Sequence, residues 1–430
     1  MSRKLIQQYT SYTMKSIKQK LIWFFVAGLL SSLLFLIANI SIGMIKASAN
    51  APDSLLPTIS QKHTVANSHL TKKPSDSNFI IAQTQSAMPF PNSFDGINEF
   101  PLGMYDRIDR PEHTAEIKNM GFNLVMPYTN PYAKKDFQTI RTYLDAANAV
   151  GLKVILEPFR ESIKQQEFAA ITEFVNEFKD HPAVAAWYSY DEPAFNEISV
   201  GLLEDVYELI KAEDPIHPVI VDFSIRRADK LTSYVNSFDI YQVNQYPLQK
   251  KSNTLQVFRS VRQEINHVAE LIDNVPFLFV VQSFENKKWR LPNLAEQKYQ
   301  VYSGLLNGAN GIFFYCYHRA PIKWQNSVVR PLVAELKNYL PAIETGSLNN
   351  KVYSDRNELQ FGLYSEDSSG RFVLVAINHE ANQINANINL DADINLNSVI
   401  NEQNNPTING EQNSFTDSFE PFEVKIYTLN

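Results

Sequence analysis

The sequence predicts a (β/α)₈ TIM barrel followed by a small antiparallel β-sandwich, on three observations. From Phe100 onward, short apolar runs alternate with longer amphipathic segments, which is typical of strands and helices around a parallel sheet. Eight such units can be counted in the chain of 430 residues. From about Ser347 the helical periodicity disappears and a two-residue period replaces it. We therefore expect a catalytic barrel over 94–346 and a β-sandwich over 347–430.

Each barrel unit has an apolar run that reads as a buried strand. The expected strands are 100–105, 123–127, 153–157, 184–190, 219–222, 239–243, 277–281 and 312–317. Helices are expected through Ile117, ending at Gly151, over 162–178, where apolar positions recur at helical spacing, and through Tyr299, Tyr302, Leu305 and Leu306. In the last segment, 372–377 and 423–427 read as strands of an accessory domain.

The first residues predict export from the cytoplasm. Five basic residues precede an apolar run over 21–45, and Ala47-Ser48-Ala49 follows it. This order fits a signal peptide over 1–49, and the run is also long enough to be an uncleaved membrane anchor. Residues 50–93 are rich in Ser, Thr, Gln, Asn and Pro and predict a disordered linker. We expect the body in the periplasm, at the cell surface or in the medium, with membrane contact only through residues 21–45.

Composition excludes several classes of function. The net charge of -7 is spread along the chain without the basic patch that nucleic acid requires. A single cysteine, Cys316, cannot form an internal disulfide. The eight histidines are scattered without the paired spacing of a zinc site, so the sequence implies no metal and no organic cofactor.

Polar and aromatic residues follow almost every expected barrel strand. Because parallel strands deliver their last side chains to one rim, these residues should meet there. Carboxylates, amides and rings together suit a polyhydroxylated ligand such as a carbohydrate. The expected catalytic residues are Glu192, Glu285 and Asp191. The expected substrate-binding residues are Tyr105, Asp106, Tyr128, Glu157, Tyr190, Asp222, Asn244, Tyr246, Gln282, Tyr317 and Trp324.

Glu192 is the strongest catalytic candidate, because it ends an apolar strand among aromatic rings. Burial favours the neutral form of a carboxylic acid and raises its pKa, as a proton donor near neutral pH requires. The alternative is structural: Asp191 caps the next helix and Glu192 pairs with an arginine.

Four stretches together resemble the barrel-type glycoside hydrolases of the β-galactosidase-like superfamily: 190–193 (Tyr-Asp-Glu-Pro), Tyr246-Pro247, Gln282, and 307–315. The likeness covers Phe100 to about Thr345, and it implies that Glu192 is the general acid/base. In that superfamily the nucleophile is a glutamate at the end of the seventh strand, where this chain has Gln282.

Three possibilities follow from this departure. Glu285 is the nucleophile, at a carboxyl separation of roughly 5 to 5.5 Å; or one of Asp106, Glu157 and Asp222 activates a water across roughly 6.5 to 9.5 Å; or the site binds a glycan without cleaving it. Each of the last three carboxylates also has an arginine nearby that offers a purely structural ion pair. The sequence thus predicts a glycosidase acting on an oligo- or polysaccharide, with a non-catalytic glycan-binding protein at the cell surface as the alternative.

Overall fold

The computed structural model describes Phe94, Ile394 and the ranges 97–128, 136–251, 275–366, 371–391, 399–401 and 413–429. The predicted signal or anchor segment and the whole of the predicted linker, 50–93, lie outside these residues. In the described part of the chain, no helix combines the length and apolarity needed to cross a bilayer.

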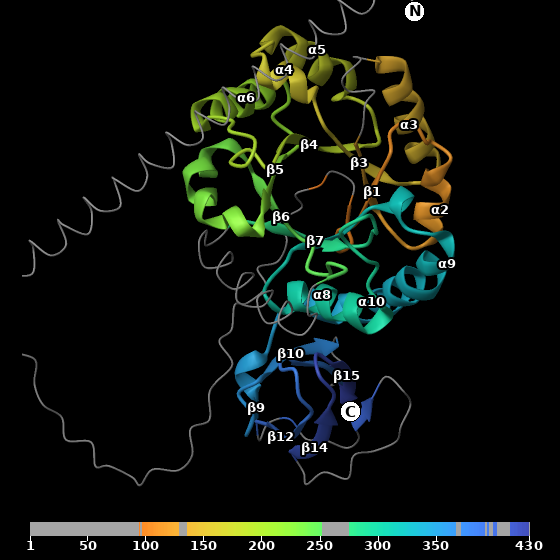
Figure 1. Cartoon of the computed structure of the whole chain (residues 1–430), viewed down its shortest axis with the longest axis vertical. Helices are drawn as coiled ribbons and strands as arrows, with labels where there is room; N and C mark the ends of the chain where they lie inside the picture. Colours follow the sequence, from red (N-terminus) through yellow and green to blue (C-terminus); the bar gives the residue numbers. More distant parts are fainter. Residues whose placement is uncertain are drawn as a thin grey trace, which may run out of the picture. The chain divides into compact units, whose positions relative to one another are not determined.

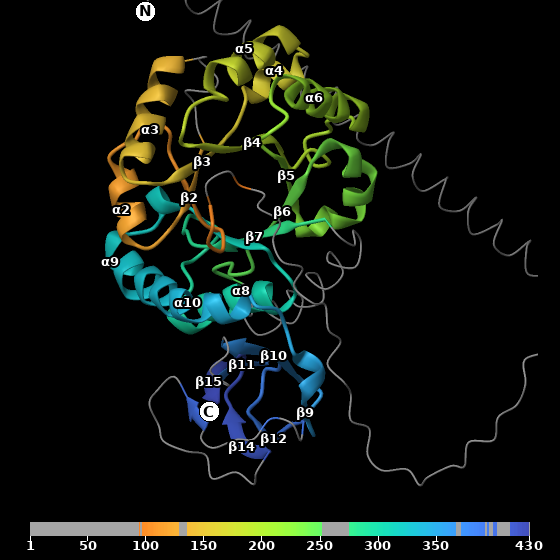
Figure 2. The ribbon, with the colours of Figure 1, turned by 180° about the vertical axis from the view of Figure 1, so that it is seen from behind.

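Eight parallel strands form a closed barrel, in which β1 pairs with both β2 and β8. The strands are β1 (Leu102–Asp106), β2 (Leu124–Pro127), β3 (Lys153–Leu156), β4 (Val184–Asp191), β5 (Val219–Ser224), β6 (Ile240–Gln245), β7 (Phe277–Gln282) and β8 (Gly311–Tyr315). No boundary differs from the sequence prediction by more than two residues. The helices lie outside this ring of strands, as both views of the ribbon show (Figures 1 and 2).

The described helices of the barrel are α2 (His113–Asn119), α3 (Phe137–Ala149), α4 (Arg160–Lys164), α5 (Phe168–Phe178), α6 (Val200–Glu213), α8 (Leu294–Leu306), α9 (Ile322–Trp324) and α10 (Arg330–Ile343). Two 3₁₀-helices, η2 (Ile225–Ser237) and η3 (Tyr317–Arg319), and a π-helix, η4 (Gln325–Val329), are also present. Side-chain caps begin several of them: Asp136 accepts from the Thr139 amide, Ser199 from Leu202, and Asn293 forms a capping box with Glu296. The single helix expected over 162–178 is wrong. It is two helices, α4 and α5, separated at Gln166, whose φ of 57° is left-handed.

Side chains alternate along the barrel strands between its interior and the surrounding helices. Leu102 and Met104 of β1 belong to the large cluster shared with the helices. Gly103 and Tyr105 alternate with them along the strand, and Tyr105 belongs to the smaller cluster inside the barrel with Phe313. Gly103 makes room for that ring: a Cβ at this position would lie 2.1 Å from a ring carbon of Phe313. The barrel interior is thus filled by side chains.

We expect Gly103→Ala to destabilise the protein by about 1–3 kcal/mol, because the added methyl forces the Phe313 ring out of a packed interior. Gly201→Ala in α6 is the matched control: nothing lies within 4 Å of its added methyl, and alanine is the better helix residue. Urea unfolding of both variants checks this. Equal or opposite shifts in their unfolding midpoints would contradict the packing described.

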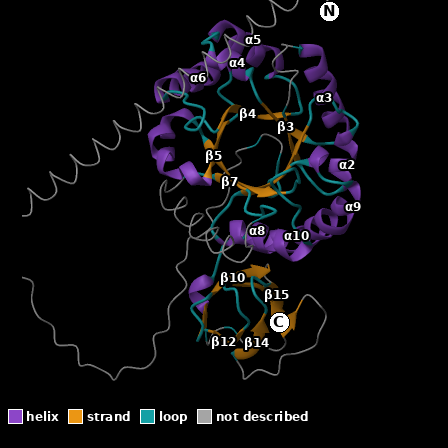
Figure 3. Ribbon diagram, in the orientation of Figure 1, coloured by secondary structure: helices purple, strands orange, loops and turns teal. Residues whose placement is uncertain are grey.

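Two antiparallel sheets follow the barrel, as predicted. One has the order β10 (Leu359–Glu366), β11 (Arg371–Asn378), β15 (Val424–Leu429) and β13 (Val399–Asn401); the other has β14 (Ser414–Phe419), β12 (Ile384–Leu390) and β9 (Val352–Ser354), preceded by η5 (Asn349–Lys351). Figure 3 colours these strands like those of the barrel. Leu374 and Ala376 face the core between the sheets, whereas Val373 and Val375 join the cluster that contains α8 and α10. The barrel and the β-sandwich together confirm the predicted fold class.

Candidate active site

The alternation of side chains decides which strand-end residues meet at the carboxyl end of the barrel, which we call the barrel mouth. Ile155, Ile220 and Ile240 face the interior. In an extended strand, residues two apart share a face. Glu157 and Asp222 therefore follow Ile155 and Ile220 toward the mouth, and Asn244 follows Ile240 by four residues.

A bulge in β4 alters this alternation just before Glu192. In the pairing with β5, Tyr188 lies opposite Ile220 and Tyr190 opposite Val221, so Ser189 is the extra residue. As a result Tyr190 turns outward into the cluster with the helices, where the Arg160 guanidinium lies 5.6 Å from its ring centroid. Asp191 turns inward, opposite Asp222. Tyr190 was expected to contact substrate, but this shift places its ring among the helices and not at the mouth.

Glu192 has a left-handed backbone, with a φ of 48°, which a non-glycine residue adopts at a cost of about 1–3 kcal/mol. Hydrogen bonds hold it there: the Glu192 amide donates to the Asp222 carbonyl at 2.9 Å, and the Asn196 side chain donates to the carbonyls of Asp191 and Glu192. This turn directs the Glu192 carboxylate toward β6.

One amide connects Glu192 with a second carboxylate. The Asn244 Nδ2 donates to Glu192 Oε1 at 3.2 Å and also to Asp222 Oδ1. Asp222 is 1% exposed, and its burial, followed by the charges of Asp191 and Glu192, raises its pKa well above the ordinary value. Burial also raises the pKa of Glu192, while the Asn244 hydrogen bond opposes the rise. The two acids thus lie one amide apart, each with a raised affinity for a proton.

An ion-paired cluster lies beside this pair. Arg160 donates to Glu157 Oε1 at 2.6 Å and to Asp191 Oδ2 at 3.3 Å, and the Tyr188 hydroxyl donates to Asp191 Oδ1 at 3.2 Å. Glu157 is therefore engaged by Arg160, as its structural alternative predicted. Its burial nevertheless raises its pKa from 4.5 to about 6. Arg160 compensates part of the negative charge at the mouth.

We expect Glu157 to make stability depend on pH. Because its pKa is higher in the folded state, the native protein binds this proton more tightly than the unfolded chain does. The ionisation of Glu157 therefore does not lower the free energy of unfolding below its unfolded pKa of 4.5, and its destabilising effect is complete above about pH 6. The difference in unfolding free energy between the wild type and Glu157→Gln should move against the wild type as pH rises through this window. Urea titrations from acid to neutral pH measure it; a constant difference or the opposite slope would contradict the assignment.

Aromatic rings form the other side of the mouth. Tyr128 and Tyr246 each stack on Tyr315, at centroid distances of 5.6 and 5.4 Å, and all three are half-buried. Tyr105 meets Tyr315 edge-on at 5.2 Å, and its hydroxyl donates to Gln242 Oε1 at 2.6 Å. We call Tyr128, Tyr315 and Tyr246 the tyrosine strip. Flat half-exposed rings of this kind suit stacking against the apolar face of a sugar.

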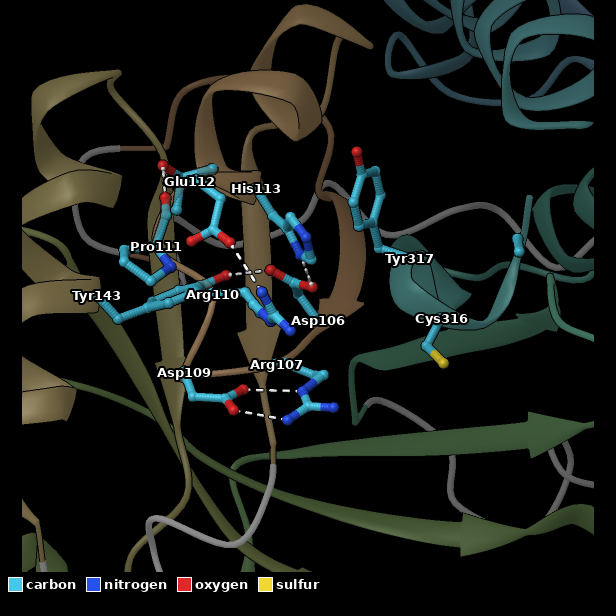
Figure 4. A network of polar contacts seen from close by, with 12 residues as sticks. Asp106, Arg107, Asp109, Arg110, Pro111, Glu112, His113, Tyr143, Cys316 and Tyr317 are labelled. Atoms are coloured by element: carbon cyan, nitrogen blue, oxygen red, sulfur yellow. Dashed lines mark hydrogen bonds and ion pairs between the residues drawn. The ribbon is translucent and has the colours of Figure 1, made fainter. Parts of the chain in front are cut away.

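Asp106 is not part of the mouth, contrary to expectation. It alternates outward at the end of β1 and is fully buried, where His113 Nδ1 lies 2.9 Å from Oδ1 and the Tyr143 hydroxyl donates to Oδ2 at 3.0 Å (Figure 4). The neighbouring arginines pair elsewhere, Arg107 with Asp109 and Arg110 with Glu112. Tyr317 also faces outward, with its ring 4.7 Å from His113. Asp106 and Tyr317 therefore stabilise the packing of the ends of β1 and β8 against α2 and α3.

Two more expected contacts are structural in this fold. The Gln282 side chain exchanges hydrogen bonds with the backbone of Leu248 and donates to the Arg290 carbonyl, so it holds the loops after β6 and β7. The Trp324 indole donates to the Pro292 carbonyl at 2.6 Å. Their hydrogen-bonding groups are therefore used within the protein.

Glu285 is not placed beside Glu192. It is exposed in the loop after β7, and its carboxylate makes no hydrogen bond or ion pair with another described residue. Of the expected site, the structure assembles Tyr105, Tyr128, Glu157, Asp191, Glu192, Asp222, Asn244 and Tyr246 around the mouth. Tyr188, Gln242 and Tyr315 were not predicted from the sequence, although each lies two residues from a side chain that faces the barrel interior.

Comparisons with known proteins bear on the fold. No protein family profile matches the chain, and no curated protein does. A GH27 β-L-arabinopyranosidase from Geobacillus stearothermophilus is similar over 77% of this chain and 96% of its own, with 9% identity and a TM-score of 0.53. A GH42 β-galactosidase from the same organism aligns over 78% of this chain and 98% of its own, with 8% identity and a TM-score of 0.49. A GH30 endoxylanase from Clostridium papyrosolvens C71 aligns over 79% of this chain and 97% of its own, with 10% identity and a TM-score of 0.47. At these identities the likeness shows the fold alone. The fold that the chain shares with the GH27 enzyme is the closed eight-stranded barrel.

Proposed function

We propose that the protein is a glycoside hydrolase acting on an oligo- or polysaccharide, with Glu192 as the general acid and Asp222 as the second carboxylate. The observation that carries the proposal is the amide of Asn244, which holds both acids at the barrel mouth beside a strip of tyrosines. Hydrolysis of an acetal needs a proton donor and an opposing negative charge, and this arrangement contains both.

The two acids have distinct environments that fit distinct roles. Glu192 is half-buried and lies where a leaving oxygen can reach it, and its raised pKa favours the protonated form. Asp222 is deeper and shares Asn244 with Glu192, so the two acids titrate as a pair. In the reactive form of the pair, Glu192 holds the proton and Asp222 is the negative charge that stabilises the oxocarbenium-like transition state. The shared amide favours the closer carboxyl spacing, at which Asp222 attacks the anomeric carbon directly.

A second candidate is a glycan-binding protein that does not cleave its ligand. It is favoured by the end of β7, where Gln282 is tied to two loops and the nearest acid, Glu285, is exposed. It predicts oligosaccharide binding without new reducing ends. The test is to incubate the protein and its Glu192→Gln variant with a panel of oligosaccharides and to measure reducing ends and binding together.

We also propose that the protein is exported, since the basic and apolar order of residues 1–49 supports a signal peptide or anchor. The mass of the purified protein distinguishes the two, because cleavage after Ala49 removes the apolar run.

A further inference from the structure

An arginine without a carboxylate partner lies at the side of the barrel mouth opposite the acids. Arg319 follows β8 in η3, is exposed, and has its guanidinium carbon 5.8 Å from the Tyr315 ring centroid. Its side chain makes no hydrogen bond or ion pair with another described residue. Arg107, Arg110 and Arg160, which also follow barrel strands, each pair with a carboxylate.

The groups that act most strongly on Arg319 are neutral. They are Tyr315, Tyr128, Cys316 and Tyr246, none of which is ionised near neutral pH. The adjacent His318 is neutral as well, because burial, followed by the charge of Arg319, lowers its pKa to about 4. Glu285 is also adjacent, since its backbone amide donates to the Arg319 carbonyl at 3.4 Å, but its carboxylate forms no ion pair with the guanidinium. The positive charge of Arg319 therefore has no ion-pair partner among the described residues.

The tyrosine strip joins this cation to the acids. Tyr246 follows Asn244 on β6, stacks on Tyr315, and Tyr315 in turn lies under Arg319. A sugar chain lying along the strip would present one residue to Glu192 and Asp222 and a substituent to Arg319. Guanidinium groups bind planar carboxylates and sulfates through paired hydrogen bonds, and a neighbouring ring leaves those donors directed away from it.

Resting on the proposed function, we propose that the glycan carries an anionic group, either a uronic acid carboxylate or a sulfate ester, which Arg319 binds while its sugar lies against the tyrosine strip. The acids at the far side do not prevent this. Arg160 offsets part of their charge, and burial raises the pKa of Asp222, which favours a proton on the Glu192–Asp222 pair.

Binding measured in the Glu192→Gln background, in which hydrolysis of oligosaccharides is expected to be slow, tests the inference. The probes are oligogalacturonates with their carboxyl-reduced counterparts, and sulfated galactose oligosaccharides with their desulfated counterparts, measured by calorimetry. We expect the acidic member of at least one pair to bind about 10- to 100-fold more tightly, the range of a hydrogen bond to a charged group. Arg319→Gln should remove this preference and leave the neutral member unaffected.

Two further variants sharpen the result. Arg319→Lys should retain more of a sulfate preference than of a carboxylate preference, because lysine lacks the planar fork. Arg371→Gln removes an exposed arginine of the β-sandwich, ion-paired with Glu366, and should change nothing. Equal binding of acidic and neutral partners in every pair, or an acid preference that survives Arg319→Gln, overturns the inference. Reducing-end release by the wild type from neutral glycans would leave the glycosidase proposal intact in that case.

Discussion

Replacing Glu192 by glutamine is expected to lower turnover by about 10²- to 10⁴-fold, the contribution of a positioned general acid. Glutamine has nearly the same shape and its amide oxygen can still accept from Asn244, so the left-handed turn should persist. What disappears is the acidic proton, whose retention burial favours by raising the pKa of Glu192. Release of reducing ends measures the loss, and circular dichroism with the melting temperature checks that the fold is unchanged.

Glu285→Gln is the informative control for this variant. It makes the same chemical change in an exposed glutamate beyond β7 that does not contact the Glu192 network. Turnover within a few-fold of the wild type is expected. A loss of turnover as large as that of Glu192→Gln would show that Glu285, and not Asp222, is the second catalytic carboxylate.

Asp222→Asn is expected to reduce turnover at least as strongly, because the transition state then lacks its opposing negative charge. Removing that charge should also lower the pKa of Glu192, since the two acids raise each other's proton affinity. Any residual activity should therefore be lost at a lower pH than in the wild type as the pH is raised, because Glu192 must be protonated to act. Turnover measured across a pH series tests both statements.

The same pair predicts the stereochemistry of the wild-type reaction. Direct attack by Asp222 followed by water gives a product with retained configuration, which proton NMR of the first-formed anomer shows. Asp180→Asn, an exposed aspartate between α5 and β4, is the control and should be fully active. An active Asp222→Asn variant with an unchanged pH profile would contradict the role given to Asp222.

The barrel was predictable because its signal repeats. Each strand is an apolar run such as 277–282, and each is separated from the next by a segment with helical periodicity, so an error in one unit does not disturb the count. The break between α4 and α5 was not predictable in the same way. It depends on the left-handed backbone of Gln166, a residue type that does not mark such a turn.

The site was only partly predictable, because strand-end position does not specify the direction of a side chain. Asp106 and Asp222 both lie near strand ends, but only Asp222 is two residues from a side chain that faces the barrel interior. This difference could have been predicted from the alternation along each strand. The bulge at Ser189, which exchanges Tyr190 for Asp191, could not, because it arises from the pairing of β4 with β5.

The most direct test of the central claim, that Glu192 donates the proton to the leaving oxygen, compares two substrates in the Glu192→Gln variant. In the glycosylation step, measured as the first-turnover release of the leaving group, an aryl glycoside whose phenol leaves without protonation should react within about tenfold of the wild-type rate, while the matching alkyl or sugar glycoside loses the full effect of the general acid. Equal losses on both substrates would contradict the account, because Glu192 would then matter for something other than proton donation.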